Sequence, residues 1–407
     1  MIILKYLVVL ADGMADFPIP ELNGKTPLQV CNKPNMDRLA QLGEVGLVRT
    51  VPPGMPPGSD VANLAVMGYN PRQYYTGRSP LEAISIGVDL ALSDISFRCN
   101  LVTLSEAQTI EEKIMLDYSA GEISTKEAEV IIKDLANELN SEEINFYSGI
   151  SYRHLMVWHN GSLECRLTPP HDISDRQIGA FLPQGDCSKK LLDLIKKSWP
   201  ILENHSVNIE RKKLGLNPAN SIWFWGEGRK PNISSFADKY GLKGSVISAV
   251  DLAKGLGISA GLKVINVPGA TGNIHTNFHG KAQAVLDAFS KGDDFVYLHI
   301  EAPDEAGHQG DLKTKIQAIE KIDAEVLELI LNELPKISVD FKILLLPDHP
   351  TPIKLKTHSS DPVPFVIYHA EKNNTEGSTG VFDEIVAGKT GIFIEEGYCL
   401  MDRFIKN

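Results

Sequence analysis

The sequence predicts an α/β protein: a mostly parallel sheet flanked by helices, with a smaller α+β domain inserted into it. Short apolar, β-branched runs such as 295–300 and 341–346 are typical of strands buried on both faces. Helical patterns separate these runs, as in parallel βαβ units. From about residue 90 to residue 218 strands follow one another directly, which indicates a separate α+β unit. We therefore expect core segments at 1–89 and 219–407 around an insert at 90–218.

The composition narrows the class of protein. The chain has 407 residues, enough for two or three domains, with 43% apolar and 23% charged residues. Its formal net charge of −12 argues against a nucleic-acid partner, because phosphate binding needs a basic surface. No run approaches the roughly 18 apolar residues of a membrane span. We expect a cytoplasmic protein with no membrane partner, and a homo-oligomer remains open.

The cysteine pattern also indicates a cytoplasmic protein. They are five in number and widely spaced, and they include no C-x-x-C pair. This pattern predicts reduced thiols rather than a disulfide framework or a cysteine zinc site.

The first core segment opens with a candidate ligand. An apolar run at 2–10 predicts the first buried strand of the parallel sheet, and Asp12 follows its carboxyl end, where open α/β sheets place their chemistry. The alternative is an ordinary turn, which an Asp-Gly pair often forms. A helix at 35–43 and a strand at 46–51 come next.

Ser59 follows a loop with four prolines and precedes a helix predicted at 61–67. A serine at this position is commonly the N-cap of the helix. The functional alternative is a nucleophile, because the helix N-terminus would stabilise a phosphoryl group there. A metal would also be needed, since a serine hydroxyl is weakly nucleophilic by itself.

The insert has elements and candidate residues of its own. We expect strands at 95–103, 113–118 and 144–158, and helices at 124–139 and 186–199. Arg153-His154 on a strand and His171-Asp172 in a proline loop would suit an anionic substrate, although for any one of them an exposed polar residue is the better explanation. Arg78, just before the insert, is either an anion contact or part of a surface loop.

The second core segment alternates strands and helices. The strand at 221–228, followed by Arg229, should re-enter the main sheet, and Lys254 follows the next strand. Further elements are expected as strands at 246–250, 264–267, 295–300, 341–346 and 365–368, and as helices at 278–290 and 312–334.

The stretch after 295–300 is the centre of the functional prediction. Asp304 and His308 are four residues apart, so on a helix both point the same way, as half of a divalent-metal site would require. The alternative is that the acidic residues here simply occupy the first turn of a helix, where the helix dipole favours negative charge. Asp348-His349, held between prolines at the end of the strand 341–346, and the nearby His358 add further candidate ligands.

These residues form one set of three carboxylates, three imidazoles and a hydroxyl. The set is enough for two divalent cations, and mixed oxygen and nitrogen ligands suit Mn²⁺ or Zn²⁺ better than Mg²⁺. Two adjacent metals are a known solution for phosphoryl transfer. The members are Asp12, Ser59, Asp304, His308, Asp348, His349 and His358.

The ordered motifs resemble the alkaline phosphatase superfamily and, within it, the archaeal-type 2,3-bisphosphoglycerate-independent phosphoglycerate mutases. The resemblance is carried over nearly the whole chain by Asp12-Gly13, Gly58-Ser59-Asp60, Asp304-x-x-x-His308, Asp348-His349-x-Thr351-Pro352, Thr357-His358, Pro169-Pro170-His171-Asp172 and Trp225-Gly226-x-Gly228. It implies an alkaline-phosphatase-like core and interconversion of 3- and 2-phosphoglycerate, a small three-carbon acid, through a phosphoserine at Ser59.

The resemblance also implies roles for individual residues. One metal would be held by Asp304, His308 and His358, and the other by Asp12, Ser59, Asp348 and His349. The insert would bind the glycerate carboxylate and close over the cleft, which excludes water from the phosphoserine. Substrate contacts and proton transfer would fall to Arg153, His154, His171, Asp172, Arg229 and Lys254.

Two alternatives remain within the same chemistry. The long form of these mutases clusters several arginines around its substrate, whereas here the insert is shorter and His171-Asp172 stands where an Arg-Asp pair is expected. A homoserine kinase-like phosphotransferase of the same family is therefore one alternative, although no Walker-type loop is present. A phosphomonoesterase is the other.

Overall fold

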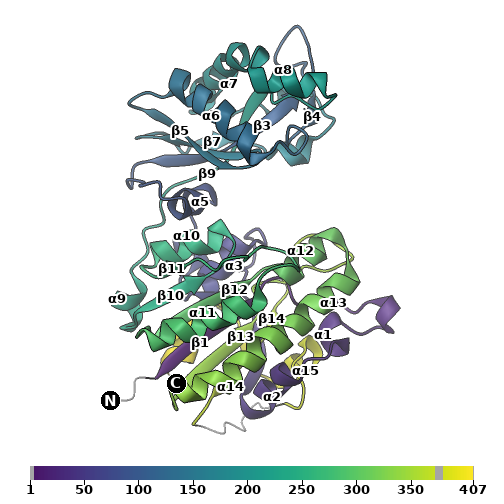
Figure 1. Ribbon diagram of the computed structural model, residues 1–407, viewed down its shortest axis with the longest axis vertical. Coiled ribbons are helices and arrows are strands. Elements are labelled where there is room, and N and C mark those ends of the chain that lie inside the picture. Colours follow the sequence, from purple (N-terminus) through teal and green to yellow (C-terminus); the bar gives the residue numbers. More distant parts are fainter. Residues whose placement is uncertain (1–3, 372–378, 407) are drawn as a thin grey trace. The chain divides into compact units, whose positions relative to one another are not determined.

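The computed structural model describes residues 4–371 and 379–406, and the chain divides into two compact units (Figure 1). Unit 1 comprises Met1–Tyr75 and Ile233–Asn407, and unit 2 comprises Thr76–Asn232. The bounds of unit 2 lie outside the range of 90–218 drawn from the sequence, because α5 and β9 at its two ends also belong to it. Among the described residues, no helix is long and apolar enough to cross a membrane.

Unit 1 is built on an eight-stranded sheet with the strand order β11-β10-β12-β1-β13-β14-β2-β15. Five neighbouring pairs run parallel; β14 is antiparallel to both β13 and β2. This confirms the predicted mostly parallel α/β sheet. The strands are β1 (Lys5–Ala11), β2 (Glu44–Val48), β10 (Gly244–Ile247), β11 (Lys263–Ile265), β12 (Phe295–Ile300), β13 (Phe341–Leu346), β14 (Val363–His369) and β15 (Phe393–Ile394).

Helices cover both faces of this sheet, and α11, α13 and α14 lie together over one of them in Figure 1. The helical elements of unit 1 are η1 (Pro20–Leu22), α1 (Pro27–Val30), α2 (Pro34–Leu42), α3 (Ser59–Val66), α4 (Pro71–Tyr74), α9 (Phe236–Tyr240), α10 (Asp251–Ser259), α11 (Phe278–Ser290), α12 (Ala302–Gln309), α13 (Leu312–Lys321), η4 (Ile322–Leu327), α14 (Glu328–Ile337), α15 (Glu384–Lys389) and α16 (Cys399–Lys406). The helix predicted at 312–334 is interrupted by η4, a π-helical turn.

The central strand β1 shows how sequence alternation assigns side chains to the two faces. Leu7 and Val9 enter the large apolar core beneath α11 and α14. Tyr6 points to the opposite face, where its ring meets Phe404 of α16 at 5.6 Å. Because β1 is paired in register with β12, Tyr297 and His299 share the face of Tyr6. Asp12, one residue beyond β1, continues on that face.

Unit 2 contains a five-stranded antiparallel sheet, in which β3 is the central strand. Its strands are β3 (Ile95–Leu104), β4 (Met115–Asp117), β5 (Ile144–Ile150), β6 (Arg153–Trp158) and β9 (Ser221–Gly228). A separate pair is formed by β7 (Cys165–Arg166) and β8 (Gln184–Gly185), and the helices are α5 (Ser79–Ser85), α6 (Thr125–Leu139), η2 (Pro170–Ile173), η3 (Gly179–Phe181), α7 (Ser188–Glu203) and α8 (Ser206–Lys213).

Two strand predictions in this region were wrong. The run 144–158 forms a hairpin, because the chain turns at Ser151, whose φ is 54°. β9 does not return to the main sheet; it pairs antiparallel with β3 in unit 2. Apolar periodicity indicates that a segment is a buried strand, but it does not indicate which strand lies beside it.

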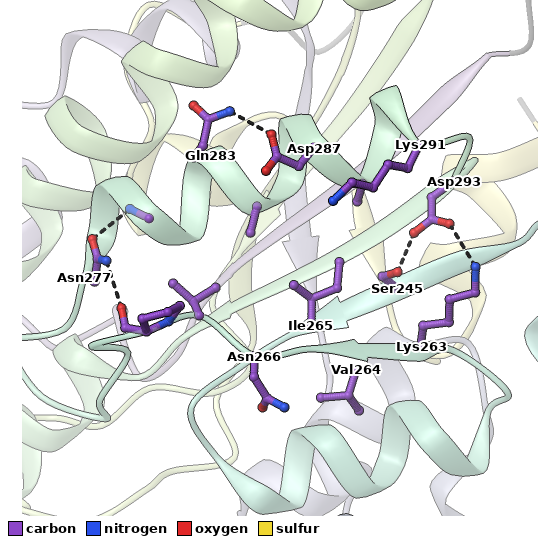
Figure 2. Close-up of a pocket in the computed structure, with 15 residues that line it drawn as sticks. Ser245, Lys263, Val264, Ile265, Asn266, Asn277, Gln283, Asp287, Lys291 and Asp293 are labelled. Carbon is purple, nitrogen blue, oxygen red and sulfur yellow. Dashed lines mark hydrogen bonds and ion pairs between the residues drawn. The ribbon is translucent and has the colours of Figure 1, made fainter.

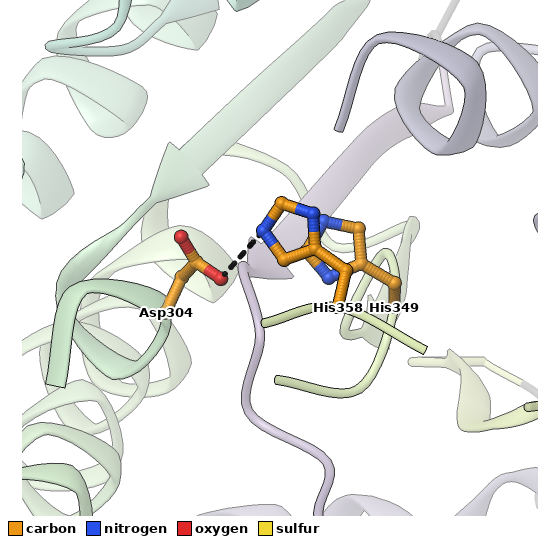
Figure 3. A group of neighbouring side chains, drawn as sticks. All are labelled: Asp304, His349 and His358. Carbon is orange, nitrogen blue, oxygen red and sulfur yellow. Dashed lines mark ion pairs between the residues drawn. The ribbon is translucent and has the colours of Figure 1, made fainter. Parts of the chain in front are cut away.

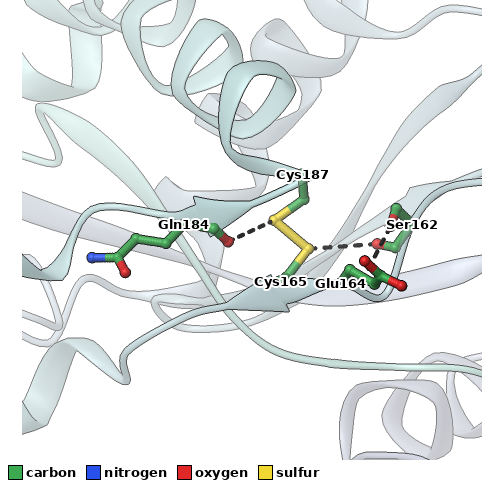
Figure 4. Close-up of a disulfide and its surroundings, with 5 residues drawn as sticks. All are labelled: Ser162, Glu164, Cys165, Gln184 and Cys187. Carbon is green, nitrogen blue, oxygen red and sulfur yellow. Dashed lines mark hydrogen bonds between the residues drawn. A yellow bond between two sulfur atoms is a disulfide. The ribbon is translucent and has the colours of Figure 1, made fainter.

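The prediction that all cysteines are reduced was also wrong. Cys165 and Cys187 form a disulfide, whereas Cys31, Cys99 and Cys399 are free thiols. The antiparallel pair β7–β8 and the start of α7 bring the two Cα atoms to 5.5 Å, within bonding range for cystine (Figure 4). These cysteines are 22 residues apart, so their spacing gave no sign of a contact.

Candidate active site

Three central strands of unit 1 bring the predicted ligands to one edge of the sheet. β12, β1 and β13 run parallel, so their carboxyl ends lie side by side. Asp12 follows β1, α12 with Asp304 follows β12, and Asp348-His349 follows β13. The sheet itself therefore gathers residues that are distant in the sequence.

Ser59 is not the N-cap of its helix. The cap position of α3 is Gly58, and Ser59 is the first helical residue, with no side-chain bond to the helix backbone. Its Oγ atom lies 3.1 Å from Nε2 of His349 instead. The N-cap alternative is therefore wrong, and a half-buried hydroxyl faces the candidate ligands at the N-terminus of a helix.

Asp304, His308 and His358 converge in unit 1. The Nε2 atoms of the two histidines lie 3.3 and 3.4 Å from the Asp304 carboxylate and 2.8 Å from each other. Their Nδ1 atoms lie near the carbonyl oxygens of Lys356 and Pro57, which fixes Nδ1 as the protonated nitrogen and leaves the lone pairs on Nε2.

The imidazole nitrogens and the carboxylate that face one another here could share either a proton or a metal ion. Asp304, His349 and His358 form one group whose ligand atoms fit a single ion (Figure 3). The nearby Asp304 carboxylate raises the pKa of His308 to about 9, and its hydrogen bonds with His308 and His358 offset burial and lower the pKa of Asp304. The donor set of oxygen and imidazole nitrogen suits Mn²⁺ or Zn²⁺.

A second group surrounds Asp12. Its Oδ1 atom is buried and has no hydrogen-bond partner among the described residues. Asp348 and His299 complete a possible ligand group with it, and Nε2 of His349 lies 3.8 Å from Oδ1. Burial, and then repulsion by Asp348 and Asp304, raise the pKa of Asp12 well above its usual value. Crowded carboxylates of this kind also fit a cation.

Sequence reasoning missed the residues that hold these ligands in place. Asn63 of α3 donates from Nδ2 to Asp348 Oδ2 at 2.9 Å, and Tyr297 donates its hydroxyl proton to Asn63 Oδ1 at 2.7 Å. Nε2 of His299 lies 3.0 Å from Asp12 Oδ2. The one available signal was a histidine and a tyrosine within the apolar run 295–300.

The predicted substrate residues lie in both units. Lys254 is on α10 of unit 1 and pairs with Asp251 at 3.7 Å. In unit 2, Arg153 is exposed and lies over the ring of Tyr152. His154 is buried, so the alternative that it is an exposed polar residue is wrong.

His154 is neutral and has one nitrogen unpaired. Its Nδ1 accepts a hydrogen bond from the Gly149 N–H at 3.1 Å, so Nε2 carries the proton. Nε2 is buried and has no partner in the part of the chain that the structure describes. Burial lowers the pKa of His154 to about 3. The Nε2–H group is therefore a buried donor with no acceptor among the described residues.

His171 and Asp172 lie on η2 and are both exposed. The His171 ring packs edge-on against Trp225 and Tyr118, with centroid distances of 5.2 and 6.0 Å. The Nε atom of Arg229, also in unit 2, is buried without a partner among the described residues. Arg78 lies at the end of the loop before α5, is partly exposed and pairs with Glu82 at 3.2 Å, so both alternatives for it stay open.

Arg98 belongs to the same part of unit 2 and was not among the candidates. It donates to both carboxylate oxygens of Glu82, at 2.8 and 2.6 Å, and its guanidinium lies 4.4 Å from the ring of Trp225. Trp225 in turn donates to Asn100 at 2.9 Å. These contacts form a rigid platform against which His171 packs.

A separate hollow in unit 1 contains none of the predicted residues. It has a volume of about 540 Å³ and lies between the edge strand β11 and α11 (Figure 2). Asn266, Asn277 and Asp287 are among the residues that line it. The candidate site is therefore defined by converging side chains rather than by this hollow.

Comparisons with known proteins show the family to which the chain belongs. The family model described as "2,3-bisphosphoglycerate-independent phosphoglycerate mutase" matches residues 40–208. A protein of Geobacter sulfurreducens named as a probable member is 50% identical over 99% of this chain and 100% of its own length. The enzyme of that name from Methanosarcina barkeri is 48% identical, with the same shares covered.

Solved structures show the same architecture. A protein of Pyrococcus horikoshii matches with a TM-score of 0.82 and 30% identity, and the match covers 100% of this chain and 97% of the other. A cofactor-independent phosphoglycerate mutase from Thermoplasma acidophilum matches with a TM-score of 0.66 and 26% identity over 99% of both chains. The chain therefore belongs to the family of 2,3-bisphosphoglycerate-independent phosphoglycerate mutases.

Proposed function

We propose that this protein interconverts 3-phosphoglycerate and 2-phosphoglycerate by way of a phosphoserine at Ser59. The observation that supports this most directly is the position of the Ser59 hydroxyl, 3.1 Å from Nε2 of His349 and at the N-terminus of α3. Family relatives that cover the full chain carry the name of this activity.

Two divalent cations, Mn²⁺ or Zn²⁺ with Mg²⁺ as a third option, would be held by the converging ligands. Asp304, His308 and His358 would bind one, and Asp12, Ser59, Asp348 and His349 the other. The close approach of His308 and His358, and the unpartnered Oδ1 of Asp12, support this. When bound, such ions lower the pKa of a hydroxyl and neutralise phosphoryl oxygens.

The other roles in phosphoryl transfer would fall to residues of the chain itself. Burial lowers the pKa of His349, so its ring is neutral. Without a cation, Nε2 can accept a hydrogen bond from the Ser59 hydroxyl; with one, the same lone pair would bind the ion. The free backbone N–H groups at the start of α3 face the transferred phosphoryl group. Ser59 Oγ would give up its proton and bond phosphorus as the bond to the substrate oxygen breaks, and that oxygen would take up a proton to leave bound glycerate. The other hydroxyl of the glycerate would then lose its proton and bond phosphorus, and Ser59 Oγ would leave and take up a proton.

Unit 2 would supply the groups that bind the carboxylate of the substrate. Arg153, the orphan donor of His154 and the His171-Asp172 pair are its candidates, with Lys254 from unit 1. Arg229 carries a further unpartnered donor. A role of unit 2 in excluding water from the phosphoserine stays a prediction.

The proposal is tested by ³¹P NMR of 3-phosphoglycerate with the Mn²⁺-loaded protein and no bisphosphoglycerate. We expect 2-phosphoglycerate to appear, and Ser59→Ala to remove the activity. Acid-quenched wild type should carry one phosphoryl group on the peptide that contains Ser59. Inorganic phosphate as the sole product would indicate a phosphomonoesterase. Formation of O-phosphohomoserine from ATP and homoserine, without mutase activity, would indicate the kinase alternative.

A further inference from the structure

Lys315 of α13 is a fully buried lysine outside the predicted site. Its ammonium donates to three acceptors: the Ala15 carbonyl at 3.1 Å, Asp16 Oδ2 at 2.8 Å and the Thr351 carbonyl at 2.8 Å. An ammonium has three protons, so these contacts satisfy it completely.

Both loops that Lys315 joins carry candidate ligands. Ala15 and Asp16 lie on the loop that begins with Asp12, and Thr351 lies two residues beyond His349. The loops also meet directly, because the N–H of Thr351 donates to the Ala15 carbonyl at 3.3 Å. Lys315 therefore fixes the distance between the ends of β1 and β13.

Thr351 extends this connection to the third ligand segment. Its hydroxyl donates to Asp304 Oδ1 on α12 and lies 3.3 Å from Nδ1 of His349. The backbone of Thr351 packs so closely on α12 that a Cβ at Gly307 would lie 2.5 Å from its carbonyl oxygen. A shift of Thr351 would move Asp304 and His349 together.

The charge of Lys315 is balanced locally. Burial disfavours the ammonium, and Asp16, itself 5% exposed, compensates as its ion-pair partner. Asp16 Oδ2 also accepts the N–H of Ile353 at 3.1 Å, so the partner is tied to the β13 loop as well. Such a buried pair contributes little net stability compared with apolar residues, but it fixes geometry strongly.

We propose that Lys315 is a positioning residue that holds the β1 and β13 loops at the spacing required for divalent-cation binding. It acts through Asp16 and Thr351 and contacts neither substrate nor ligand atoms. The inference rests on the proposed function, because that function supplies the cation site.

The test measures the binding of Mn²⁺ alone to wild type and two variants by titration calorimetry. Lys315→Met keeps an unbranched side chain one atom shorter and removes its donors. The double variant Lys315→Met/Asp16→Asn also removes the partner charge, so that it folds without an unpaired buried carboxylate. Both should bind Mn²⁺ at least about tenfold more weakly, the usual effect of losing support for metal ligands. At saturating Mn²⁺ their kcat should approach that of wild type.

Lys342→Met is the matched control. Lys342 is also a buried lysine, but its ammonium donates to the Phe404 carbonyl at the opposite end of β13 from the ligands. Its Mn²⁺ affinity should be unchanged. Equal affinity in wild type and the folded double variant, or an equal loss in Lys342→Met, would overturn the inference alone. Wild type that binds Mn²⁺ but lacks mutase activity would overturn the proposed function alone, and wild type that binds no Mn²⁺ would overturn both.

Discussion

Nε2 of His308 and Nε2 of His358 lie 2.8 Å apart, and both face the carboxylate of Asp304. Two imidazole lone pairs at this distance repel each other unless a proton or a metal ion lies between them. The rings are held there by contacts of their Nδ1 atoms with two backbone carbonyls, not by attraction for each other. This arrangement suits a shared proton or a metal ion at this point, and the proposed function assigns a metal ion to it.

Removal of divalent cations should lower both thermal stability and activity. A ligand present at 100 times its Kd stabilises the native state by about 2.7 kcal/mol. We expect dialysis against EDTA to lower Tm and added Mn²⁺ to restore it, as measured by scanning calorimetry. In His308→Asn the gain on adding Mn²⁺ should be smaller. A Tm that does not respond to either treatment in wild type would contradict the cation site.

Asn63→Leu should weaken the site without removing a proposed ligand. The change takes away the donor to Asp348 Oδ2 and the acceptor of the Tyr297 hydroxyl. We expect Mn²⁺ affinity or kcat/KM to fall by about 10- to 100-fold. Tyr297→Phe, which leaves the bond from Asn63 to Asp348 in place, should have a smaller effect. If the two variants behave alike, Asn63 does not act through Asp348.

Gly13→Ala tests the close packing of the β1 loop on α12. Gly13 has φ of 63°, and a Cβ there would lie 2.6 Å from both the Cα of Asp304 and Oγ1 of Thr351. We expect a loss of about 1–3 kcal/mol in the free energy of unfolding and a lower kcat/KM. Gly24→Ala is the control, since its φ is 76° but a Cβ would meet nothing within 4 Å. Similar kinetics in the two variants would show that backbone strain alone matters.

Glu384 should make stability depend on pH. Burial raises the pKa of its carboxyl to about 7, while the carboxylate accepts from the Asp16 N–H at 3.1 Å and the Thr26 hydroxyl at 2.7 Å. Since the folded state holds this proton more tightly than the unfolded state, the free energy of unfolding falls as pH rises from about 4.5 to 7. The loss in the free energy of unfolding is roughly 2 kcal/mol. This figure is lower than the full pKa shift implies, because Glu384 is partly exposed and solvent screens its charge.

The variant Glu384→Gln should lack this decline. In urea unfolding at pH 5, 6, 7 and 8, the difference in stability between variant and wild type should shift in favour of the variant up to pH 7 and then level. Glu333→Gln, which changes a surface glutamate paired with Lys336, should show no such trend. A constant difference for Glu384→Gln would rule out the buried proton.

The sequence was most informative where residue type and spacing carry the chemistry. The spacing of Asp304 and His308 indicated a shared helix face, and α12 provides it. Asn63 and His299 were missed because an asparagine within a helix and a histidine within a strand resemble many structural residues. Their function comes from neighbours more than two hundred residues away, and periodicity does not encode such contacts.

The pairing of β9 was missed for a related reason. Its apolar pattern fits either sheet, and the choice of β3 depends on the packing of unit 2 as a whole. The disulfide likewise depends on how β7 and β8 pair. Topology decides these contacts, and local patterns carry little information about topology.

The strand order of unit 1 sets a sequence of events during synthesis. Tyr6 of β1 pairs with Phe295 and Lys342, whereas unit 2 is one continuous stretch, Thr76–Asn232. On the ribosome the inserted unit is complete while β1 still lacks both of its neighbours, and at about 5–20 residues per second the wait until β12 is made lasts roughly 3–14 s. The earliest-made strand of the protein is thus an apolar segment that must be shielded until the last third of the chain emerges.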